Sequence, residues 1–401
     1  MKIRFWFLLY NRNIGGLKIK IAFITNYPPR CGRLSEYAFN LIDEIQKCPT
    51  VSHIDIITEI SSSEVARING KVTLHPVWKL DNPFSFILIL KEIIALKPDI
   101  VHFNMHMAVF GQSRISNFLG LSLPFLSKII GFKTIVTLHN FVDKIDIKKA
   151  GFKDTFVSRL SAFLVTKLIA SSSAVTLTMK SYTDFFSKRY HCKNAVTIPH
   201  GTWKYNSFDQ GQVCRKDAIL YIGHSGPSKD IELLFDTFKI LEEKNRGLKL
   251  ILAGTSHPNY PHYLDKYRKN TDKVFFTGYV PENQLQALFE KANAVILPYR
   301  TCTGTSGIAH LASSYGTPIV ATDLPEFREL AEEGCGLLIS AHNPQALAQK
   351  VEEIFDNPKL ALELRERNIT FATSRSWNIV AEHFCSLYEE LLHRQKKEYA
   401  L

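Results

Sequence analysis

The chain has 401 residues, of which 45% are hydrophobic and 22% are charged. This length and composition predict a soluble globular protein with two domains, and they exclude a fibrous or wholly disordered chain. The formal charge is +11, but residues 1–200 carry +13, with 26 Lys and Arg against 13 Asp and Glu, and the remainder carries −2. This imbalance indicates an anionic partner such as a phospholipid surface, a lipid phosphate, a polyanionic glycan or a nucleic acid.

Seven cysteines are scattered along the chain without a CxxC pair: Cys31, Cys48, Cys192, Cys214, Cys302, Cys335 and Cys385. Their odd number and wide spacing are typical of a reduced cytoplasmic protein. They argue against a disulfide framework and against a zinc site.

The first feature in chain order is an N-terminal extension over residues 1–17, with a basic start and an apolar run from Phe5 to Tyr10. The run is too short to cross a bilayer, and no small-residue cleavage site follows it. Three interpretations stay open: a tail that lies on a membrane, a disordered segment, or a start codon assigned too early.

From residue 18 onward, strand and helix patterns alternate. In the first half, strands are predicted over 19–25, 54–58, 100–103, 134–138, 174–178 and 196–199, with helices such as 35–46, 84–96 and 153–170 between them. In the second half, strands are predicted over 218–223, 249–254, 274–278, 294–298, 319–322 and 336–339. Near-continuous apolar strands between helices indicate parallel sheets covered on both faces. The sequence therefore predicts an α/β fold of two doubly wound, Rossmann-like domains facing a cleft.

We expect the first domain to span residues 18–205 and the second residues 206–375. The stretch 201–217 is polar, contains glycine and lacks periodicity, so it predicts the seam between them. Residues 376–394 are strongly helical and no strand follows, so the prediction closes with a C-terminal helix within 376–401.

Ligands of open parallel sheets bind beyond the carboxyl ends of the strands, so those positions are the candidates for chemistry. After the first strand, "TNYPPRCGRLSEYAF" combines a turn stiffened by Pro28 and Pro29 with Gly32 and a helix start at Ser35. The stretch is either a plain strand-ending loop or a binding loop. Without a GxGxxG pattern it is not a dinucleotide fingerprint.

Several histidines lie at strand ends of the first half. His139 follows the strand 134–138, a position that points into a crevice, although most lone histidines have a structural role. In "DIVHFNMH", His102 is expected inside the strand with Asn104 and His106 beyond it, and here a structural role is favoured. His200 closes the last strand of the first domain and taken alone marks only a turn.

In the second half, "YIGHSGPSKDIELLFDTF" places Gly223 and Gly226 in a flexible loop and Lys229 in the first turn of an amphipathic helix. A lysine near a helix N-terminus is electrostatically unfavourable unless an anion joins it. Surface lysines are common, so the signal is of moderate strength.

The stretch "PYRTCTGTSGIAHLASSYGTPIVAT" opens the predicted helix 307–315 with small residues. Gly304, Thr305, Ser306 and Gly307 can present several backbone N–H groups there. A diphosphate would accept them, and the helix dipole would add about 0.3–1 kcal/mol. The alternative is an ordinary capped loop.

In this order, the motifs resemble those of the retaining nucleotide-sugar glycosyltransferases of family 4, which have the GT-B fold. The resemblance rests on "ITNYPPRCG", "VTLHN", "VTIPHGT", "ILYIGHSGPSKDIELLFDTF", "VFFTGYVPENQLQALFEKANAVILPY" and "GTPIVATDLPEF", and it covers roughly residues 18–395. "RSWNIVAEHFCSLYEELL" resembles the terminal helix of the family, which implies a helix that crosses back onto the first domain.

Roles for individual residues follow from the resemblance alone. It implies that His139 lies near the transferred sugar and that Lys229 contacts the donor diphosphate, so these two are the predicted catalytic residues. The predicted donor-binding residues are Gly32, Gly223, His224, Lys229, Thr303, Gly304, Thr305, Ser306, Gly307 and Glu326. The predicted acceptor-side residues are Arg30, Asn104, His106 and His200.

The sequence also departs from the family pattern. The two usual glutamates, eight positions apart, are replaced by Thr303 and Leu311, and the arginine common before the lysine is absent, with His224 and Gly226 in its place. A subgroup with Ser-Gly before this helix resembles the chain better. The departures motivate the alternative of a catalytically inactive GT-B protein that acts as a binding or regulatory subunit.

The resulting prediction is a hexosyltransferase that uses a nucleoside diphosphate sugar, retains the anomeric configuration and needs neither metal nor cofactor. The expected acceptor is a hydroxyl of a glycan or lipid-linked glycan in cell-surface polysaccharide or glycolipid synthesis. No nucleic-acid partner is expected, because no recognised module appears and the basic residues are not interleaved with aromatics.

Two segments bear on a membrane partner. "LSLPFLSKIIGF" and "GFKDTFVSRLSAFLVTKL" mix apolar residues with lysine and arginine, as helices that lie on an anionic membrane do. They are equally typical of core helices with solvated faces. The expected location is therefore the cytoplasm, either free or on the inner face of the cell membrane.

Overall fold

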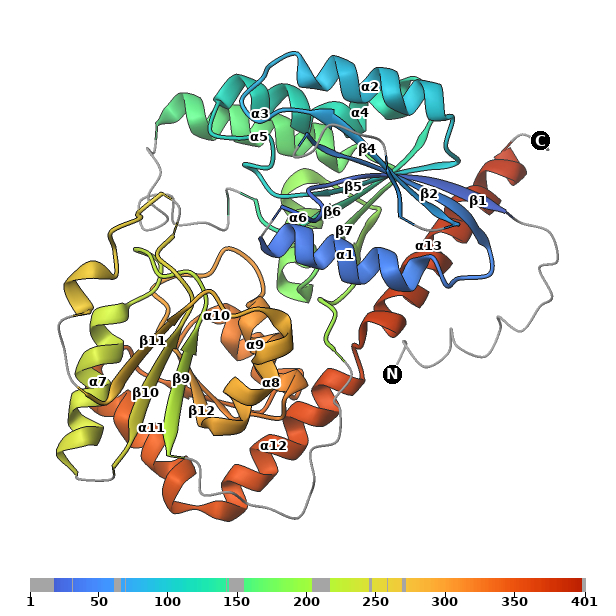
Figure 1. Cartoon of the computed structure of the whole chain (residues 1–401). Helices are drawn as coiled ribbons and strands as arrows, with labels where there is room; N and C mark the ends of the chain where they lie inside the picture. The colour runs from blue at the N-terminus through green and yellow to red at the C-terminus, as the bar shows by residue number, and fades with distance from the viewer. Residues whose placement is uncertain are drawn as a thin grey trace.

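The computed structural model describes residues 18–30, 32–60, 66–68, 70–141, 143, 155–203, 217–244, 247–257, 259–268 and 272–398. The predictions for residues 1–17, for most of the seam 201–217, and for Cys31, Cys214 and Lys153 lie outside these residues. Figure 1 shows two α/β domains, with the C-terminal helix running from the second domain back along the first.

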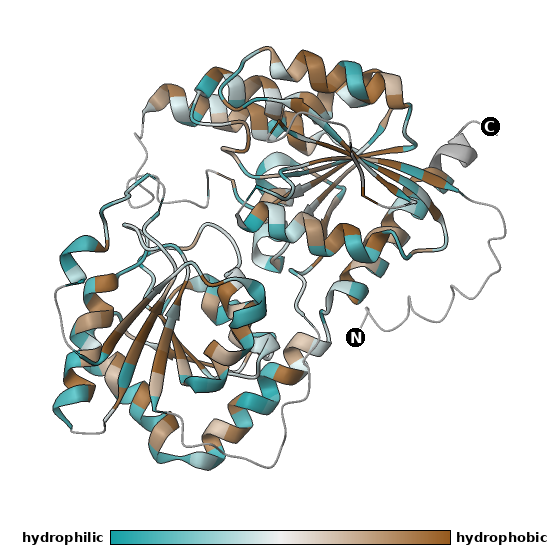
Figure 2. Cartoon of the chain, in the orientation of Figure 1, coloured by the Kyte–Doolittle hydropathy of each residue, from teal (hydrophilic) through white to brown (hydrophobic). Residues whose placement is uncertain are grey.

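The first domain is built on a sheet of eight strands in the order β3-β4-β2-β1-β5-β6-β7-β8. The strands are β1 (Ile19–Ile24), β2 (Val51–Glu59), β3 (Ala66–Arg67), β4 (Val72–Trp78), β5 (Ile100–Met105), β6 (Lys133–Leu138), β7 (Ala174–Leu177) and β8 (Ala195–Thr197). All neighbours pair in parallel except β3 with β4. The strands are largely hydrophobic in Figure 2, and most of their residues, including polar ones such as Asp55 and His102, are buried because both faces of the sheet are covered.

The sequence prediction misses β4, because Pro76 interrupts its apolar pattern. The strand nevertheless pairs with β2, with Pro76 opposite Thr58. A proline is tolerated here because β4 lies next to the edge of the sheet, where β3 covers only Thr73 and Leu74.

Helices cover the two faces of this sheet unequally. They are α1 (Arg33–Ile45), α2 (Ser85–Leu96), α3 (Arg114–Leu121), α4 (Leu123–Ile129), α5 (Phe156–Ala170) and α6 (Lys180–Tyr190). One core joins the strands to α1 and the C-terminal helix, and the other joins them to the remaining helices. Helix α5 begins at Phe156, because the Thr155 side chain caps it by accepting a hydrogen bond from the Ser158 amide.

The second domain has a sheet of six parallel strands in the order β11-β10-β9-β12-β13-β14. The strands are β9 (Ala218–Ile222), β10 (Lys249–Ala253), β11 (Val274–Gly278), β12 (Ala292–Leu297), β13 (Ile319–Thr322) and β14 (Leu337–Ser340). The helices are α7 (Ile231–Glu243), α8 (Glu282–Lys291), α9 (Gly307–Ser314), α10 (Pro325–Glu332), α11 (Pro344–Asp356) and α12 (Pro358–Thr373). The predicted architecture of two Rossmann-like domains is thus confirmed.

Helix α13 (Trp377–Glu398) belongs to the first domain by its packing, although it follows the second in sequence (Figure 1). Its apolar residues recur every three or four positions, so one stripe, which includes Trp377, Phe384 and Tyr388, enters the core beside α1. The Tyr388 hydroxyl lies 2.7 Å from Nδ1 of His102. The chain passes between the domains near Thr202 and again near Arg375. The Thr202 amide donates to the Arg375 carbonyl and the Trp377 amide donates to the Thr202 carbonyl, so these two segments lie side by side.

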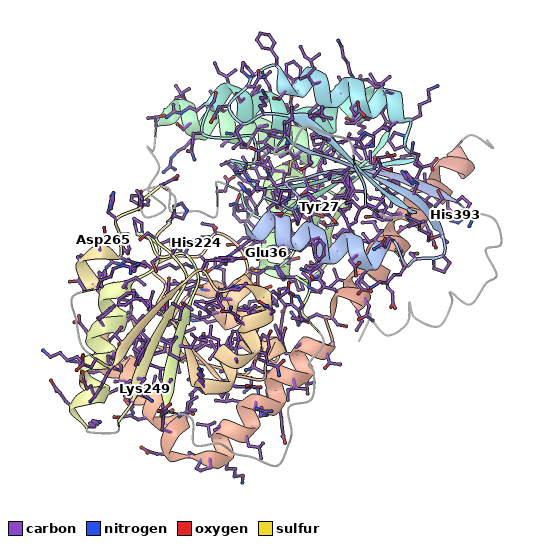
Figure 3. The ribbon with its side chains drawn as sticks, viewed as in Figure 1. Tyr27, Glu36, His224, Lys249, Asp265 and His393 are labelled. Atoms are coloured by element: carbon purple, nitrogen blue, oxygen red, sulfur yellow. The ribbon has the colours of Figure 1, made fainter. Side chains whose placement is uncertain are left out.

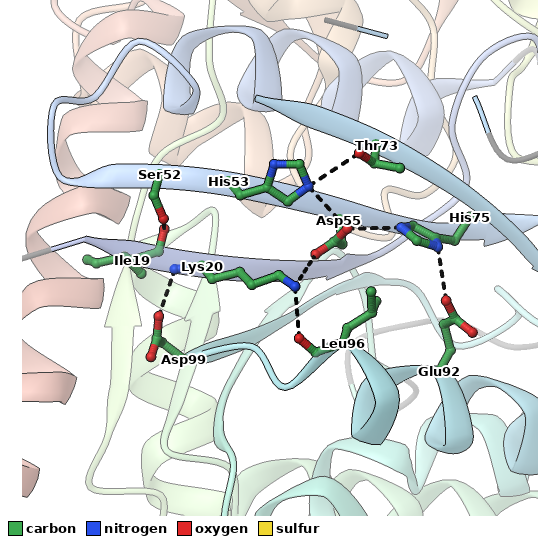
Figure 4. A network of polar contacts seen from close by, with 10 residues as sticks. All are labelled: Ile19, Lys20, Ser52, His53, Asp55, Thr73, His75, Glu92, Leu96 and Asp99. Atoms are coloured by element: carbon green, nitrogen blue, oxygen red, sulfur yellow. Dashed lines mark hydrogen bonds and ion pairs between the residues drawn. The ribbon is translucent and has the colours of Figure 1, made fainter. Parts of the chain in front are cut away.

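A polar cluster crosses the first sheet beneath α2 (Figure 4). The Asp55 carboxylate lies 3.2 Å from Lys20 Nζ and 2.9 Å from His75 Nε2, and His75 Nδ1 lies 2.9 Å from Glu92. Burial opposes the charge of Asp55, but the bonds from His75 and Lys20 lower its pKa overall. The bond to Asp55 outweighs burial and raises the pKa of His75. The cluster therefore joins β1, β2, β4 and α2 through charged partners.

None of the helices in the described part of the chain is long and apolar enough to cross a membrane.

Candidate active site

The carboxyl ends of the strands of both sheets meet where the two domains touch. Figure 3 shows His224, just after β9, on the side of the second domain that faces the first, with Lys249 at the far end of the sheet. Gly304, in the loop after β12, approaches so closely that a Cβ there would collide with the carbonyl oxygen of His139, which follows β6. The predicted strand-end loops of the two domains are thus brought together.

The loop before α9 offers unpaired backbone donors. Ser306 caps the helix, its hydroxyl accepting a hydrogen bond from the Ala309 amide, and the Thr305 hydroxyl lies 2.8 Å from Nε2 of His310. The amides of Gly304, Thr305 and Gly307 find no acceptor among the described residues. Amides at the first turn of a helix are suited to an anion.

Lys229 lies one residue before the cap of α7, so its predicted place in the first helical turn is wrong. The helix starts at Ile231 because the Asp230 carboxylate accepts a hydrogen bond from the Leu233 amide. The Lys229 ammonium lies over the ring of Tyr299, at the start of the loop after β12. Burial lowers the pKa of Lys229 well below its usual value, and the charge of Arg33 adds to that effect.

His139 is held in one orientation by Asn104. Its Nε2 lies 2.6 Å from the amide oxygen of Asn104, whose nitrogen donates to the Thr25 hydroxyl and to the Leu34 carbonyl. This arrangement assigns the proton to Nε2 and leaves Nδ1 without a partner in the described chain. Burial, with the charges of neighbouring histidines, lowers the pKa of His139 to about 3. The ring is therefore neutral near pH 7.

The predicted acceptor-side residues occupy different environments. Asn104 lies inside β5 and is fully buried, which corrects the prediction that it follows the strand. His106 does follow β5, and its Nδ1 accepts a hydrogen bond from the Ala108 amide. Arg30 pairs with Glu59. His102 has both ring nitrogens occupied, by Tyr388 and by Thr137, which agrees with the expected structural role.

Two contacts across the domain interface involve predicted site residues. The ring of His200 stacks on that of His310, with centroids 4.8 Å apart. The Glu326 carboxylate, in the first turn of α10, accepts a hydrogen bond of 2.7 Å from the Tyr182 hydroxyl of α6. Glu326 thus joins the domains directly.

The other predicted donor-side residues are more open. His224 is exposed, and its Nδ1 lies 3.2 Å from the Thr255 hydroxyl. Gly223, with a φ of 128°, and the half-buried Thr303 lie in the loops after β9 and β12. Leu311, at the second position where the family has a glutamate, lies in the apolar core beneath α9.

Sequence reasoning missed Arg33, Tyr37 and Tyr299. Helix α1 begins at Arg33, two residues earlier than predicted, with Gly32 as its cap at a φ of 141°. Arg33 is therefore a cation at a helix start, the same signal that singled out Lys229. Tyr37 packs edge-on against His139 at 4.5 Å between centroids, and its buried hydroxyl has no partner in the described chain.

The described residues include no group of three or more His, Cys, Asp or Glu side chains placed to hold a metal ion.

Comparison with known proteins agrees with this architecture. Residues 206–372 match the family model of glycosyl transferases group 1. The chain is 25% identical over 184 residues to the D-inositol 3-phosphate glycosyltransferase of Corynebacterium glutamicum, covering 43% of each chain. It is 24% identical to the O-antigen chain mannosyltransferase RfbU of Salmonella typhimurium, over 53% of this chain and 63% of that one. The matched stretch spans about half the length of the curated relatives.

Solved structures match over nearly the whole chain. The sucrose-phosphate synthase of Thermosynechococcus elongatus superposes with a TM-score of 0.74 at 17% identity, covering 94% of this chain and 100% of that one. Anabaena Alr3699/HepE, solved in complex with UDP-glucose, gives a TM-score of 0.68 at 14% identity over 93% and 100%. The fold is therefore GT-B, and the second domain resembles the glycosyl transferases group 1.

Proposed function

We propose that this protein transfers a hexosyl group from a nucleoside diphosphate sugar to a hydroxyl of a glycan or lipid-linked glycan, with retention of the anomeric configuration. The observation that carries the proposal is the convergence of Lys229, the free amides of the loop before α9 (Gly304, Thr305 and Gly307) and His139 where the two sheets meet. The likeness to a structure solved with UDP-glucose supports a nucleotide-sugar donor.

The proposed step breaks the bond between the anomeric carbon and the diphosphate oxygen, which leaves with the electron pair. The acceptor oxygen bonds to the same face of that carbon, and its proton passes to the departing diphosphate. The amides and Lys229 stabilise the charge that grows on the diphosphate, and no metal is assigned to this role. Preorganised donors of this kind typically contribute about 2.7–4 kcal/mol each.

His139 is proposed to orient the sugar. Its ring is neutral and fixed through Nε2, so Nδ1 is the atom left to accept a hydrogen bond from a sugar hydroxyl. Closure of the domains around the donor would exclude water and align the acceptor.

The direct test is thermal stability of the purified protein against UDP, GDP, ADP, CMP, dTDP and their sugars. A ligand at 100 times its Kd should stabilise the fold by about 2.7 kcal/mol, which is a measurable melting shift. A shift with one nucleotide series supports the donor site and identifies the base. No shift with any would favour the inactive-subunit alternative, for which Thr303 and Leu311 in place of carboxylates are the reason.

We also propose that the first domain docks on an anionic membrane and takes its acceptor there. Helices α2, α3, α4 and α5 lie at the top of this domain in Figure 1 and carry hydrophobic residues in Figure 2. Their side chains include Phe156, which is 79% exposed, and Ile129, which is 66% exposed. Further members of this surface are Phe84, Ile87, Leu88, Ile94, Ile115, Ile130, Val157, Leu160 and Leu164. Basic residues of the same helices include Lys91, Lys128 and Lys167. Helices that carry both exposed apolar side chains and basic residues suit an anionic lipid surface.

Flotation with liposomes containing anionic lipid tests this second proposal. The wild type should float, and the double variant Phe156→Glu/Leu160→Glu should stay with the soluble fraction. Leu362→Glu is a matched control, because Leu362 is 55% exposed but lies on α12 of the second domain. A wild-type protein that does not float leaves only soluble acceptors.

A further inference from the structure

Arg33 belongs to the first domain, but its guanidinium reaches the second. Its Nη2 lies 3.1 Å from the position of a Cβ built on Gly223, and its Nη1 lies 3.7 Å from one built on Gly307. The two terminal nitrogens therefore lie against different loops of the second domain, one after β9 and the other at the start of α9.

Arg33 and Lys229 both act on Tyr299. The Lys229 ammonium lies over the ring of Tyr299, and the charge of Arg33 opposes the rise that burial causes in the pKa of Tyr299. The charge of Arg33 also acts on His224, whose pKa is lowered first by burial and then by the guanidinium. Two cations from two domains thus converge at the free amides of α9.

Arg33 forms no ion pair with the carboxylates that the structure describes. Glu36, one turn further along α1, feels the charge of Arg33, but burial still raises its pKa. Two neighbouring cations at the positive end of a helix repel each other and the helix dipole. An anion placed between them would convert each of these repulsions into an attraction.

We propose that Arg33 binds the diphosphate of the donor, as a second cation that the first domain supplies to a site otherwise built by the second. This inference rests on the proposed function. A guanidinium can take two phosphate oxygens at once, whereas the Lys229 ammonium acts as a point charge. Their roles are therefore complementary rather than redundant.

The origin of Arg33 in α1 has a consequence for domain motion. Its bond to the diphosphate exists only while the domains are closed, so a bound diphosphate stabilises the closed state. A nucleoside that lacks phosphates would gain nothing from Arg33 and would not favour closure. Arg33 should therefore contribute to the affinity for the diphosphate and not to the affinity for the nucleoside.

The experiment compares wild type, Arg33→Ala, Arg33→Lys and Arg114→Ala. Arg114 is the matched control, because it is also an exposed arginine at the first position of a helix in the same domain. Calorimetry measures the affinity for the nucleoside diphosphate that stabilises the wild type most and for the corresponding nucleoside. Small-angle scattering measures compaction when the diphosphate is added.

We expect Arg33→Ala to bind the nucleoside diphosphate at least tenfold more weakly, to bind the nucleoside as the wild type does, and to lose the compaction. Arg33→Lys should be intermediate and Arg114→Ala unchanged. Equal diphosphate affinity in wild type and Arg33→Ala overturns the inference but leaves the proposed function standing. An equal loss of diphosphate and nucleoside affinity also overturns it, because it indicates a general structural role. A wild type that binds none of the diphosphates overturns both.

Discussion

The imidazole rings of His200 and His310 stack across the domain interface, with centroids 4.8 Å apart and planes 16° from parallel. His200 ends the first domain, whereas His310 lies in α9 of the second. Burial lowers the pKa of His200 to about 4 and that of His310 well below its usual value. Two neutral rings can stack in this way, whereas two protonated rings would repel.

We predict that acid destabilises the protein through its buried histidines. His102 and His139 have pKa values lowered to about 3 from the usual 6.5. Below pH 6.5 the unfolded chain binds protons at these histidines that the folded chain does not. Their contribution to the free energy of unfolding is therefore complete above pH 6.5 and is lost as the pH falls from 6.5 toward the folded pKa. Each such group contributes up to about 1.4 kcal/mol per pH unit in that window.

Denaturant unfolding at pH 7, 6, 5 and 4 measures this dependence. In the variant His102→Gln, the free energy of unfolding should fall less steeply as the pH is lowered, by the equivalent of about one proton. A stability that stays flat down to pH 4 would show that these histidines titrate normally in the folded protein.

The contribution of His75 to stability should have the opposite pH dependence. Its bond to Asp55 raises its pKa, so its contribution is full below 6.5 and is lost as the pH rises through the folded value. His75→Gln should therefore lose more unfolding free energy at pH 6 than at pH 9, relative to the wild type. His262→Gln is the control, because that side chain is 88% exposed and its pair with Asp265 is solvated. A pH-independent loss would mean that His75 contributes by packing alone.

Lys229→Ala should lower the turnover number at least tenfold without changing the melting temperature by more than a few degrees. The reason is that a positive charge beside the leaving diphosphate is lost. Lys239→Ala, at an exposed position of α7, should leave turnover unchanged. Near-normal turnover of Lys229→Ala would remove this lysine from the site.

His139→Ala should impair transfer while leaving the affinity for the nucleoside diphosphate within about twofold. Its partner Asn104 should affect stability instead, because Asn104→Leu leaves His139 Nε2 buried without an acceptor. An unsatisfied buried group costs about 1–3 kcal/mol. Steady-state kinetics with calorimetry separates the two effects, and loss of nucleotide binding in His139→Ala would contradict the role assigned to it.

Gly304→Ala should keep the domains from closing fully. The new methyl group would collide with the His139 carbonyl oxygen, so the loop before α9 must move away from the first domain. We expect reduced turnover and a larger radius of gyration by small-angle scattering. Gly70→Ala serves as the control, since its Cβ meets nothing within 4 Å. Unchanged scattering and turnover would show that the loop adapts without opening the interface.

Much of the fold could be predicted because its signals are local. Apolar runs of strand length between helical patterns specify two parallel sheets, and the same runs locate the strand ends where His139 and Lys229 lie. The predicted elements are wrong where tertiary packing overrides a local sequence preference. The prediction misses strand β4 at Pro76, which the edge of the sheet tolerates. Helix α1 begins two residues earlier than predicted, and α7 begins after Lys229 instead of including it in the first turn.

The sequence by itself determined the fold class and the strand-end positions of Lys229, His139 and the Gly304–Gly307 loop, because periodicity and capping act over a few residues. Only the tertiary structure decided that Arg33 reaches Gly223, that His200 stacks on His310 and that Tyr182 donates to Glu326. These partners are more than 100 positions apart in sequence. Their contact depends on how two separately folded sheets pack against each other, and no local pattern encodes that geometry.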